Sequence, residues 1–321
     1  MYSSGKHLKD EGSRSQVVIA GAISGMIARF FIAPLDVIKI RLQLQTRPLA
    51  NSIFQRSSFS SPLNTGALFT LKNILKNEGI TALWKGNVPA ELMYISYSAI
   101  QFTTYRSISL ALQSFLGENY LSTAAESFIA GAFAGATATT ATYPLDLLRT
   151  RLAAQGKEKI YRSLAHSVRE IYKSEGSHGF FRGLGAGVGQ IIPHMGIFFS
   201  VYETLRLPLN TLHLPFSTGD ASAGVLASVI AKTCVFPFDL VRKRLQVQGP
   251  TRSRYVYKDI PNYHGIFQTF RKILTTDGPR GLYRGLTVSL LKSAPTGAIV
   301  IFTYERTLHM LMKLDEINKD L

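Results

Sequence analysis

One eight-residue pattern occurs three times in this chain of 321 residues. Each copy begins with a proline at the end of an apolar run, has an acid two residues later and a base three residues after the acid, and ends on a second base. The copies occupy residues 34–41, 144–151 and 237–244, so their starts are 110 and 93 residues apart. Such spacing indicates an internal repeat, which constrains the fold more than any single motif.

A second pattern follows each of these octets. An acid–glycine pair is followed by an aromatic residue, a base and a glycine, over residues 78–86, 175–183 and 277–285. An apolar stretch precedes each octet and follows each second pattern. At 1.5 Å of helix per residue, these stretches approach the length that a bilayer requires. The sequence therefore predicts six candidate membrane spans, at 17–35, 86–105, 127–145, 183–202, 221–238 and 285–304.

Three shorter pieces between the spans have apolar residues at helical spacing. They occupy residues 67–76, 164–173 and 266–275. At ten residues each they are too short to cross a bilayer, and their amphipathic pattern is typical of helices that lie along a membrane surface.

The charge of the chain is strongly basic, at +16, although only 17% of its residues are charged. Six apolar stretches argue against a soluble nucleic-acid-binding protein, so we expect no nucleic-acid partner. Loops within the repeats hold 18 Lys and Arg, against 4 in the segments on the other side. The positive-inside rule then places the basic loops inside and both termini outside.

Residues suited to catalysis or to metal binding are scattered along the chain. The seven histidines form no metal-ligand spacing, and no glycine-rich phosphate loop follows a strand pattern. We therefore expect no enzyme, no cofactor and no metal. The single cysteine, Cys234, excludes an internal disulfide, and we expect it to be a small buried apolar residue.

Together, the two repeated patterns resemble those of the mitochondrial carrier family over residues 16–313. The resemblance implies an all-α membrane protein with six transmembrane helices, built from three tandem two-helix repeats with pseudo-three-fold symmetry, plus short amphipathic helices on the matrix side. It also implies a monomer in the mitochondrial inner membrane, with both termini toward the intermembrane space. The expected divisions are a tail at 1–15 and repeats at 16–113, 122–208 and 216–313 within one structural domain.

Three strings, at residues 33–45, 83–91 and 241–252, are similar to those of family members that carry thiamine pyrophosphate. This resemblance implies transport of that compound, in exchange for nucleotides or related phosphates, by alternating access. A carrier for another anionic phosphate metabolite, such as a nucleotide or a coenzyme, and an anion or proton channel remain the alternatives.

The octets carry the charges of an expected matrix-side gate. An acid and a base three residues apart share one face of a helix. The resemblance implies that each acid pairs with a base of a neighbouring repeat: Asp36 with Arg149, Asp146 with Arg242, and Asp239 with Lys39. In the family a glutamine braces each pair; Gln43 and Gln246 match, whereas Ala153 does not, so we expect two braces. Charges reaching to a membrane interface are the alternative interpretation.

The expected cytoplasmic-side gate departs from the family pattern. Glu203 and Arg206 match it, but Glu305 lacks a base partner and Arg106 replaces an acid. Arg106 is therefore expected to pair with Glu203 or Glu305. A gate this weak predicts a resting state that is open to the matrix.

The residues of the expected substrate site are found by counting along the sequence from the repeated patterns. Arg29, Thr139 and Lys232 lie seven residues before the acids of the octets, and the resemblance implies substrate contacts at Met93, Gln190, Ile191 and Lys292. Unpaired cations at membrane depth are costly and usually functional, so Arg29, Lys232 and Lys292 predict an anionic substrate. The alternative is that Glu91 or Glu126 balances these cations. Tyr97 and Tyr143 are candidates to stack on the thiamine rings.

Glycines at the starts of helices are candidate lipid sites, because helix N-termini bind phosphate. The resemblance implies that such positions hold cardiolipin. The candidates are Gly66, Gly86, Gly183, Gly265 and Gly285.

Overall fold

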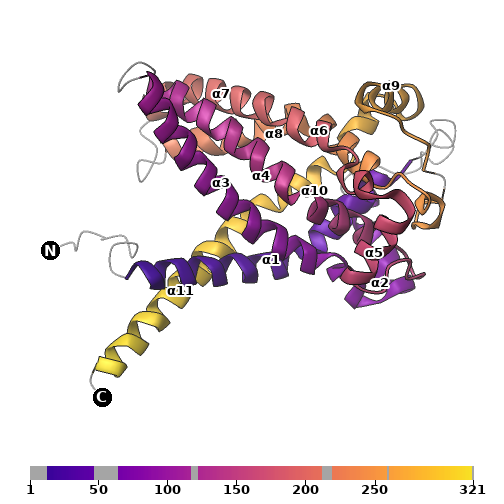
Figure 1. Ribbon diagram of the computed structural model, residues 1–321, viewed down its shortest axis with the longest axis horizontal. Coiled ribbons are helices and arrows are strands. Elements are labelled where there is room, and N and C mark those ends of the chain that lie inside the picture. The colour runs from indigo at the N-terminus through magenta and orange to yellow at the C-terminus, as the bar shows by residue number, and fades with distance from the viewer. Residues whose placement is uncertain (1–12, 47–63, 117–121, 212–218, 259, 320–321) are drawn as a thin grey trace.

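The computed structural model describes residues 13–46, 64–116, 122–211, 219–258 and 260–319, and in these ranges every regular element is a helix (Figure 1). The tail expected at 1–15 therefore lies outside the described residues, apart from its last three.

Long helices account for most of the described chain. The odd-numbered candidate spans fall in α1 (Arg14–Leu44), α4 (Thr123–Ala154) and α8 (Gly219–Gln246). The even-numbered ones fall in α3 (Asn87–Leu116), in α6 (Leu184–Gly189) with α7 (Ile191–Thr211), and in α10 (Leu286–Leu291) with α11 (Ser293–Lys319). Four segments are long and apolar enough to cross a membrane: Gln16–Leu44, Ser177–Asn210, Gly219–Gln246 and Pro279–Asp315. Helices α3 and α4 have the length but are richer in Ala, Ser and Thr.

Three short helices lie where the amphipathic pattern predicts them. They are α2 (Phe69–Glu78), α5 (Leu164–Glu175) and α9 (Ile266–Asp277), and each is followed by a 3₁₀ turn, η4 (Ile80–Trp84), η5 (Ser177–Phe181) or η8 (Pro279–Tyr283). Each buries one isoleucine almost completely, Ile74, Ile171 or Ile273, so the apolar face points into the protein. Two further short elements are η3 (Asn64–Leu68) and η7 (Arg252–Arg254).

Two of the even-numbered spans are interrupted, which the sequence analysis did not anticipate. The break between α6 and α7 falls at Gln190, and the break between α10 and α11 falls at Lys292. A proline follows each break by three residues, at Pro193 and Pro295. Because proline has no N–H, the carbonyl four residues earlier loses its helical partner. Helix α3 has Ser96 at this position and is continuous.

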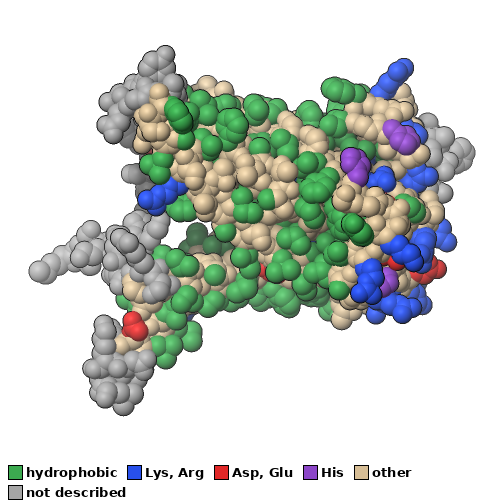
Figure 2. All heavy atoms as spheres, viewed as in Figure 1, with side chains coloured by type: hydrophobic (Ala, Val, Ile, Leu, Met, Phe, Trp, Pro, Cys, Tyr) green, Lys and Arg blue, Asp and Glu red, His purple; other side chains and the backbone are tan. Residues whose placement is uncertain are grey.

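The long helices pack most closely across the boundaries between repeats, α3 with α4, α7 with α8, and α1 with α11. Figure 1 shows α1 and α11 diverging from the other long helices toward the end where α1 begins and α11 ends, with α2, α5 and α9 at the opposite end. Lys and Arg gather at this opposite end on the face that Figure 2 shows. Side chains such as Phe30, Phe102 and Phe133 are exposed along the long helices, as lipid contact requires.

The proline of the first octet bends α1 next to an aromatic residue of the second pattern. Pro34 leaves the carbonyl of Phe30 without its helical donor. The indole Nε1 of Trp84 donates to that oxygen at 2.9 Å, and the two rings are 5.4 Å apart. In the third repeat, Tyr283 stacks on Phe236, directly before the proline of α8. These contacts explain why the second pattern carries an aromatic residue.

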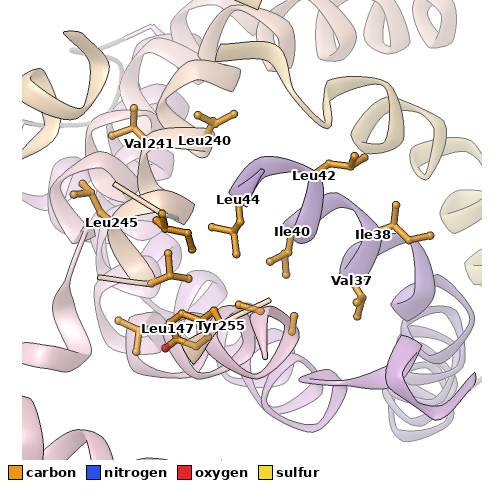
Figure 3. Packing of buried hydrophobic residues seen from close by; sticks show 14 of the residues in the cluster. Val37, Ile38, Ile40, Leu42, Leu44, Leu147, Leu240, Val241, Leu245 and Tyr255 are labelled. Atoms are coloured by element: carbon orange, nitrogen blue, oxygen red, sulfur yellow. The ribbon is translucent and has the colours of Figure 1, made fainter. Parts of the chain in front are cut away.

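The main hydrophobic core lies where α1, α4 and α8 end. Figure 3 shows Ile40 and Leu44 of α1 pointing toward Leu147 and Tyr255. Cys234 is not part of this core; the sequence analysis was wrong to expect it buried, since its side chain is exposed on α8.

Candidate substrate-binding cavity and its gates

A cavity of about 680 Å³ lies between the long helices. Its lining includes Met93, Gln190 and Ile191, which the family resemblance offers as substrate contacts, and Thr139. The charged lining residues number six bases and three acids, a surplus of three positive charges: Lys39, Arg149, Lys232, Arg242, Lys243, Lys292, Asp36, Asp146 and Asp239.

A ring of ion pairs crosses one end of this cavity. Each octet acid lies within salt-bridge distance of the base expected as its partner: Asp36 and Arg149 at 2.5 Å, Asp146 and Arg242 at 2.8 Å, Asp239 and Lys39 at 2.7 Å. Gln43 Nε2 donates to Asp239 Oδ2 at 3.0 Å, and Gln246 Nε2 donates to Asp146 Oδ2 at 2.5 Å. The ring therefore joins α1, α4 and α8 just after their prolines.

The third corner of the ring has no glutamine, because Ala153 occupies that position. Two other cations bind Asp36 there in addition to Arg149. Lys292 Nζ lies 2.5 Å from Asp36 Oδ1, and Arg29 Nη1 lies 3.4 Å from Asp36 Oδ2. The expectation that Arg29 and Lys292 are uncompensated is therefore wrong. Asp36 is the partner of both, shared with Arg149, and neither Glu91 nor Glu126 forms an ion pair with them.

Arg29 also lies outside the set of residues that line the cavity. Its guanidinium carbon is 3.1 Å from the centroid of the Tyr94 ring, a cation–π contact that holds it against α3. Arg29 thus supports Asp36 and Tyr94 from behind, whereas Lys292 reaches the cavity itself.

Lys232 is the one basic lining residue that forms no ion pair within the described ranges. Its ammonium donates to the backbone carbonyl of Ser289 at 3.0 Å. That carbonyl belongs to α10, three residues before the break at Lys292. Lys232 therefore keeps a net positive charge at the cavity wall with only a neutral acceptor beside it.

The ring contains a base that the sequence analysis missed. Lys243 Nζ donates to both carboxylate oxygens of Asp146 at 2.9 Å, and also to Thr150 Oγ1 and Gln246 Oε1 at 3.0 Å. The one sign of this base in the sequence is its position: Lys243 is the seventh residue of its octet, where the first two octets have the uncharged Ile40 and Thr150. The corner at Asp146 is consequently the most heavily bonded of the three.

A second network, also missed, involves the last base of each octet. Arg41, Arg151 and Arg244 are fully buried. Each pairs with the acid of the acid–glycine pair in its own repeat, Glu78, Glu175 or Asp277, at 2.5, 2.6 and 2.7 Å respectively. Each also donates from Nε to a backbone carbonyl in the first long helix of another repeat. Arg41 donates to Ala153 of α4, Arg151 to Gln246 of α8, and Arg244 to Gln43 of α1. The three repeats are thereby fastened end to end.

The pairing lowers the pKa of Glu78 from its usual 4.5. Burial alone would raise this pKa, but the hydrogen bonds from Arg41 and Lys85 outweigh it. Burial lowers the pKa of Lys85 despite its contact with Glu78. Of the two hydrogen bonds to Glu78, that from Arg41 lowers the pKa of the carboxylate more. Since the pKa of Glu78 is lower when folded, its contribution to stability is present above about pH 4.5 and is lost as the pH falls below it.

The opposite end of the cavity has no comparable ring. Within the described ranges, Arg106, Glu203 and Glu305 form no ion pair, and Arg206 pairs instead with Asp220 at 3.0 Å. This conformation has the opposite end open, so the pairing of Arg106 with Glu203 or Glu305 stays a prediction for the state in which that end closes. The predicted resting state is open to the matrix. The structure differs from it, because the ring at the octets is closed.

The tyrosines differ in their access to the cavity. Tyr97 lines it together with Tyr94. Tyr143 is fully buried, and its hydroxyl donates to the carbonyl of Arg182 at 2.8 Å. The ring of Tyr143 is therefore unavailable to stack on a substrate, contrary to the expectation.

A second cavity of about 490 Å³ lies where α3 and α5 begin. Its lining includes Gly86, Ser163, the acid Glu78 and four basic residues, Lys85, Lys157, Lys159 and Arg162. Gly183, Gly265 and Gly285 directly precede α6, α9 and α10. Gly66 does not begin a helix of this kind, because it lies within η3 and α2 starts at Phe69.

Gly86 is required by packing as well. Its φ of 82° favours glycine, and a Cβ there would lie 2.6 Å from the carbonyl oxygen of Arg149. A side chain at this position would push α3 away from the ring base on α4. The glycine therefore brings the two repeats together whether or not a lipid binds.

Comparison with known proteins relates the whole chain to one family. A family model described as mitochondrial carrier protein matches residues 11–115, 121–211 and 215–315. The chain is 66% identical over 316 residues to the mitochondrial thiamine pyrophosphate carrier 1 of Sclerotinia sclerotiorum and, again at 66% over 316 residues, to that of Botryotinia fuckeliana, with 98% of each chain covered. It is 57% identical to the protein of that name from Coccidioides immitis, covering 98% of this chain and 99% of the relative. The chain belongs to the mitochondrial carrier family.

Proposed function

We propose that this protein transports thiamine pyrophosphate across the mitochondrial inner membrane. The observation that carries the proposal is identity of 66% over 98% of the chain with carriers named for that compound. The cavity chemistry supports it, because a surplus of three positive charges suits a diphosphate.

The proposed architecture is a monomer that crosses the membrane six times. Helices α3 and α4 would then span the bilayer together with the four more apolar segments. The three repeats, at 16–113, 122–208 and 216–313, form one domain with pseudo-three-fold symmetry. The basic end with α2, α5 and α9 faces the matrix, and both termini face the intermembrane space, as the positive-inside rule favours.

The proposed transport cycle is alternating access. The diphosphate enters the cavity from the side opposite the ring and binds Lys232 and Lys292, with Arg29 supporting the site from behind Tyr94. Met93, Gln190 and Ile191 contact the rest of the substrate, and Tyr97 offers an aromatic face. The ring of Asp36, Lys39, Asp146, Arg149, Asp239 and Arg242, braced by Gln43 and Gln246, is the matrix gate. Its opening is matched by closure near Arg106, Glu203, Arg206 and Glu305, and a nucleotide or related phosphate returns by the same route.

Membrane lipids are the proposed partners at the matrix-side helix starts. The second cavity combines the beginnings of α3 and α5 with four basic side chains, a setting that suits a phosphate headgroup such as that of cardiolipin. We propose Gly86 for this site, and Gly183, Gly265 and Gly285 for the equivalent positions.

Uptake by reconstituted liposomes tests the function. The vesicles are preloaded with thiamine pyrophosphate, a nucleotide, inorganic phosphate or buffer alone, and labelled thiamine pyrophosphate is added outside. We expect saturable uptake that requires an internal phosphate substrate. Uptake proportional to concentration into empty vesicles would indicate a channel. A preparation that exchanges nucleotides but takes up no thiamine pyrophosphate would refute the proposed substrate.

A further inference from the structure

The three corners of the ring differ in what holds each carboxylate. Asp146 is bound by Arg242, Lys243 and Gln246, and Asp239 by Lys39 and Gln43, all of them residues of the octets or the turn that follows. Asp36 alone binds cations from outside the octets, Lys292 of the α10–α11 break and Arg29 of α1. It is also the corner where Ala153 replaces the bracing glutamine.

Asp36 therefore belongs both to the ring and to the substrate cavity. Lys292, Asp36 and Arg149 all line that cavity, so an anion inside it can reach the same ammonium that Asp36 now holds. An anion that approaches Lys292 meets the Asp36 carboxylate 2.5 Å from the ammonium nitrogen. The two negative groups repel each other and compete for one cation.

We propose that Asp36 is the resident counter-ion of the anion site and that the transported phosphate displaces it from Lys292. When the substrate takes over Lys292, Asp36 retains Arg29 of its own helix and Arg149 of the neighbouring helix α4. The corner between α1 and α4 is then the least supported of the three, because it has no brace, and the matrix gate opens there first. Substrate binding and gate opening are thus coupled through one carboxylate, as a coupling between two sites requires.

The inference deepens the proposed function and rests on it only in requiring an anionic substrate. Its test therefore uses inorganic pyrophosphate, measured by calorimetry on the purified full chain in detergent. The informative variant is Asp36→Asn, which keeps the size of the side chain and removes the competing charge. We expect it to bind pyrophosphate about fivefold more tightly than the unmodified protein, at the lower end of typical coupling between sites.

Asp239→Asn is the matched control, because it also breaks one ring pair and frees a lysine, Lys39. We expect a smaller gain in affinity from this variant. A double variant, Asp36→Asn with Lys292→Gln, should bind no better than Lys292→Gln alone, since the freed cation is absent. Equal gains from Asp36→Asn and Asp239→Asn, or a double variant that binds as tightly as Asp36→Asn, would overturn the proposal.

Transport kinetics separate this role from a structural one. In liposomes, Asp36→Asn should lower both the KM and the maximal rate of exchange, because tighter ground-state binding no longer opens the gate. Asp36→Glu, which restores the charge, should recover part of the rate. A variant that only loses rate, with an unchanged KM, would contradict displacement. Pyrophosphate binding in this pattern without thiamine pyrophosphate uptake would refute the proposed substrate and leave the counter-ion role intact.

Discussion

Lys292 is the residue at which the cavity, the ring and a helix break meet. Its ammonium reaches into the cavity, binds Asp36 Oδ1 and belongs to the interruption between α10 and α11. Removing it leaves Asp36 with Arg149 and Arg29, so the carboxylate does not become an unpaired buried charge.

Lys292→Ala should therefore abolish transport while the fold survives. We expect uptake of thiamine pyrophosphate into liposomes to fall by about tenfold or more, the cost of one charge-assisted contact, with little change in the temperature of unfolding. Lys76→Ala, on the exposed face of α2, is the control and should transport normally. Normal uptake by Lys292→Ala would remove this residue from the site.

Individual side chains were predictable from the sequence where the three repeats agree, and not where they differ. The octets, together with the family resemblance that they carry, were enough to name the partners of Asp36, Asp146 and Asp239. It did not reveal that Lys292 also reaches Asp36, because that contact joins residues 256 positions apart and has no counterpart in the other repeats. Lys243 was missed for the same reason: a single charged residue within a repeat looks like ordinary variation.

Among the elements, the bend of α1 at Pro34 depends on a contact from the second sequence pattern. Trp84 supplies the donor that the proline lacks, and its ring packs on Phe30. The hydrogen bond at this bend can therefore be removed by a substitution that keeps an aromatic ring at position 84.

Trp84→Phe should weaken the packing of η4 against α1 by leaving the carbonyl of Phe30 unpaired. The bond is exposed on the surface of the long helices, where lipid or detergent offers no replacement donor, so the expected cost is about 1–3 kcal/mol, seen as a lower temperature of unfolding in detergent. Phe181 occupies the same position in the second repeat, so an aromatic ring without a donor is tolerated there. Phe181→Trp is the control and should not destabilise the protein by a comparable amount. Equal stability of Trp84→Phe and the unmodified protein would show that the carbonyl needs no donor.

Apolar length and periodicity predicted the long helices and the three surface helices closely. Each surface helix runs to the acid of its acid–glycine pair, two residues beyond the periodic stretch. The breaks at Gln190 and Lys292 were not predicted, although Pro193 and Pro295 were visible, because a proline within an apolar run usually bends a helix without dividing it. Gly66 was wrongly expected to begin a surface helix, because it lies as far before the acid of its acid–glycine pair as Gly265 does. In the structure Gly265 directly precedes α9, whereas Gly66 lies within η3.

At the scale of the whole molecule, the closed ring determines which end of the cavity is accessible. All three expected ion pairs of the ring are formed, whereas the other end has, within the described ranges, only the pair of Arg206 with Asp220 between the adjacent helices α7 and α8. The distribution of Lys and Arg along the sequence predicted a basic end of the molecule, and Figure 2 shows these residues gathered at the end where the surface helices lie. It did not give the conformation, because the sequence carries both gates at once.

A cysteine inside the cavity tests this accessibility. Ser228 lines the cavity and is similar in size to cysteine, so Ser228→Cys in a Cys234→Ser background is a mild change. We expect a membrane-impermeant maleimide applied from the cytosolic side to label the substrate-free protein, and thiamine pyrophosphate to slow the labelling. The Cys234→Ser protein alone is the control. If the cysteine is labelled only when the reagent can reach the matrix, the substrate-free protein is open to the matrix, as the weak outer gate predicts.

The surplus of three positive charges in the cavity also has an electrical consequence. While the ring is closed, this charge faces one aqueous compartment, and after the ring opens it faces the other. A transmembrane voltage changes the free energy of that step by about 2.3 kcal/mol for each elementary charge and 100 mV that the charge effectively crosses. Bound thiamine pyrophosphate, whose diphosphate is anionic and whose thiazolium is a cation, cancels most of the surplus, so the loaded cavity responds less to voltage than the empty one. The empty cavity keeps its charge, and a matrix-negative potential therefore draws it toward the matrix-facing form.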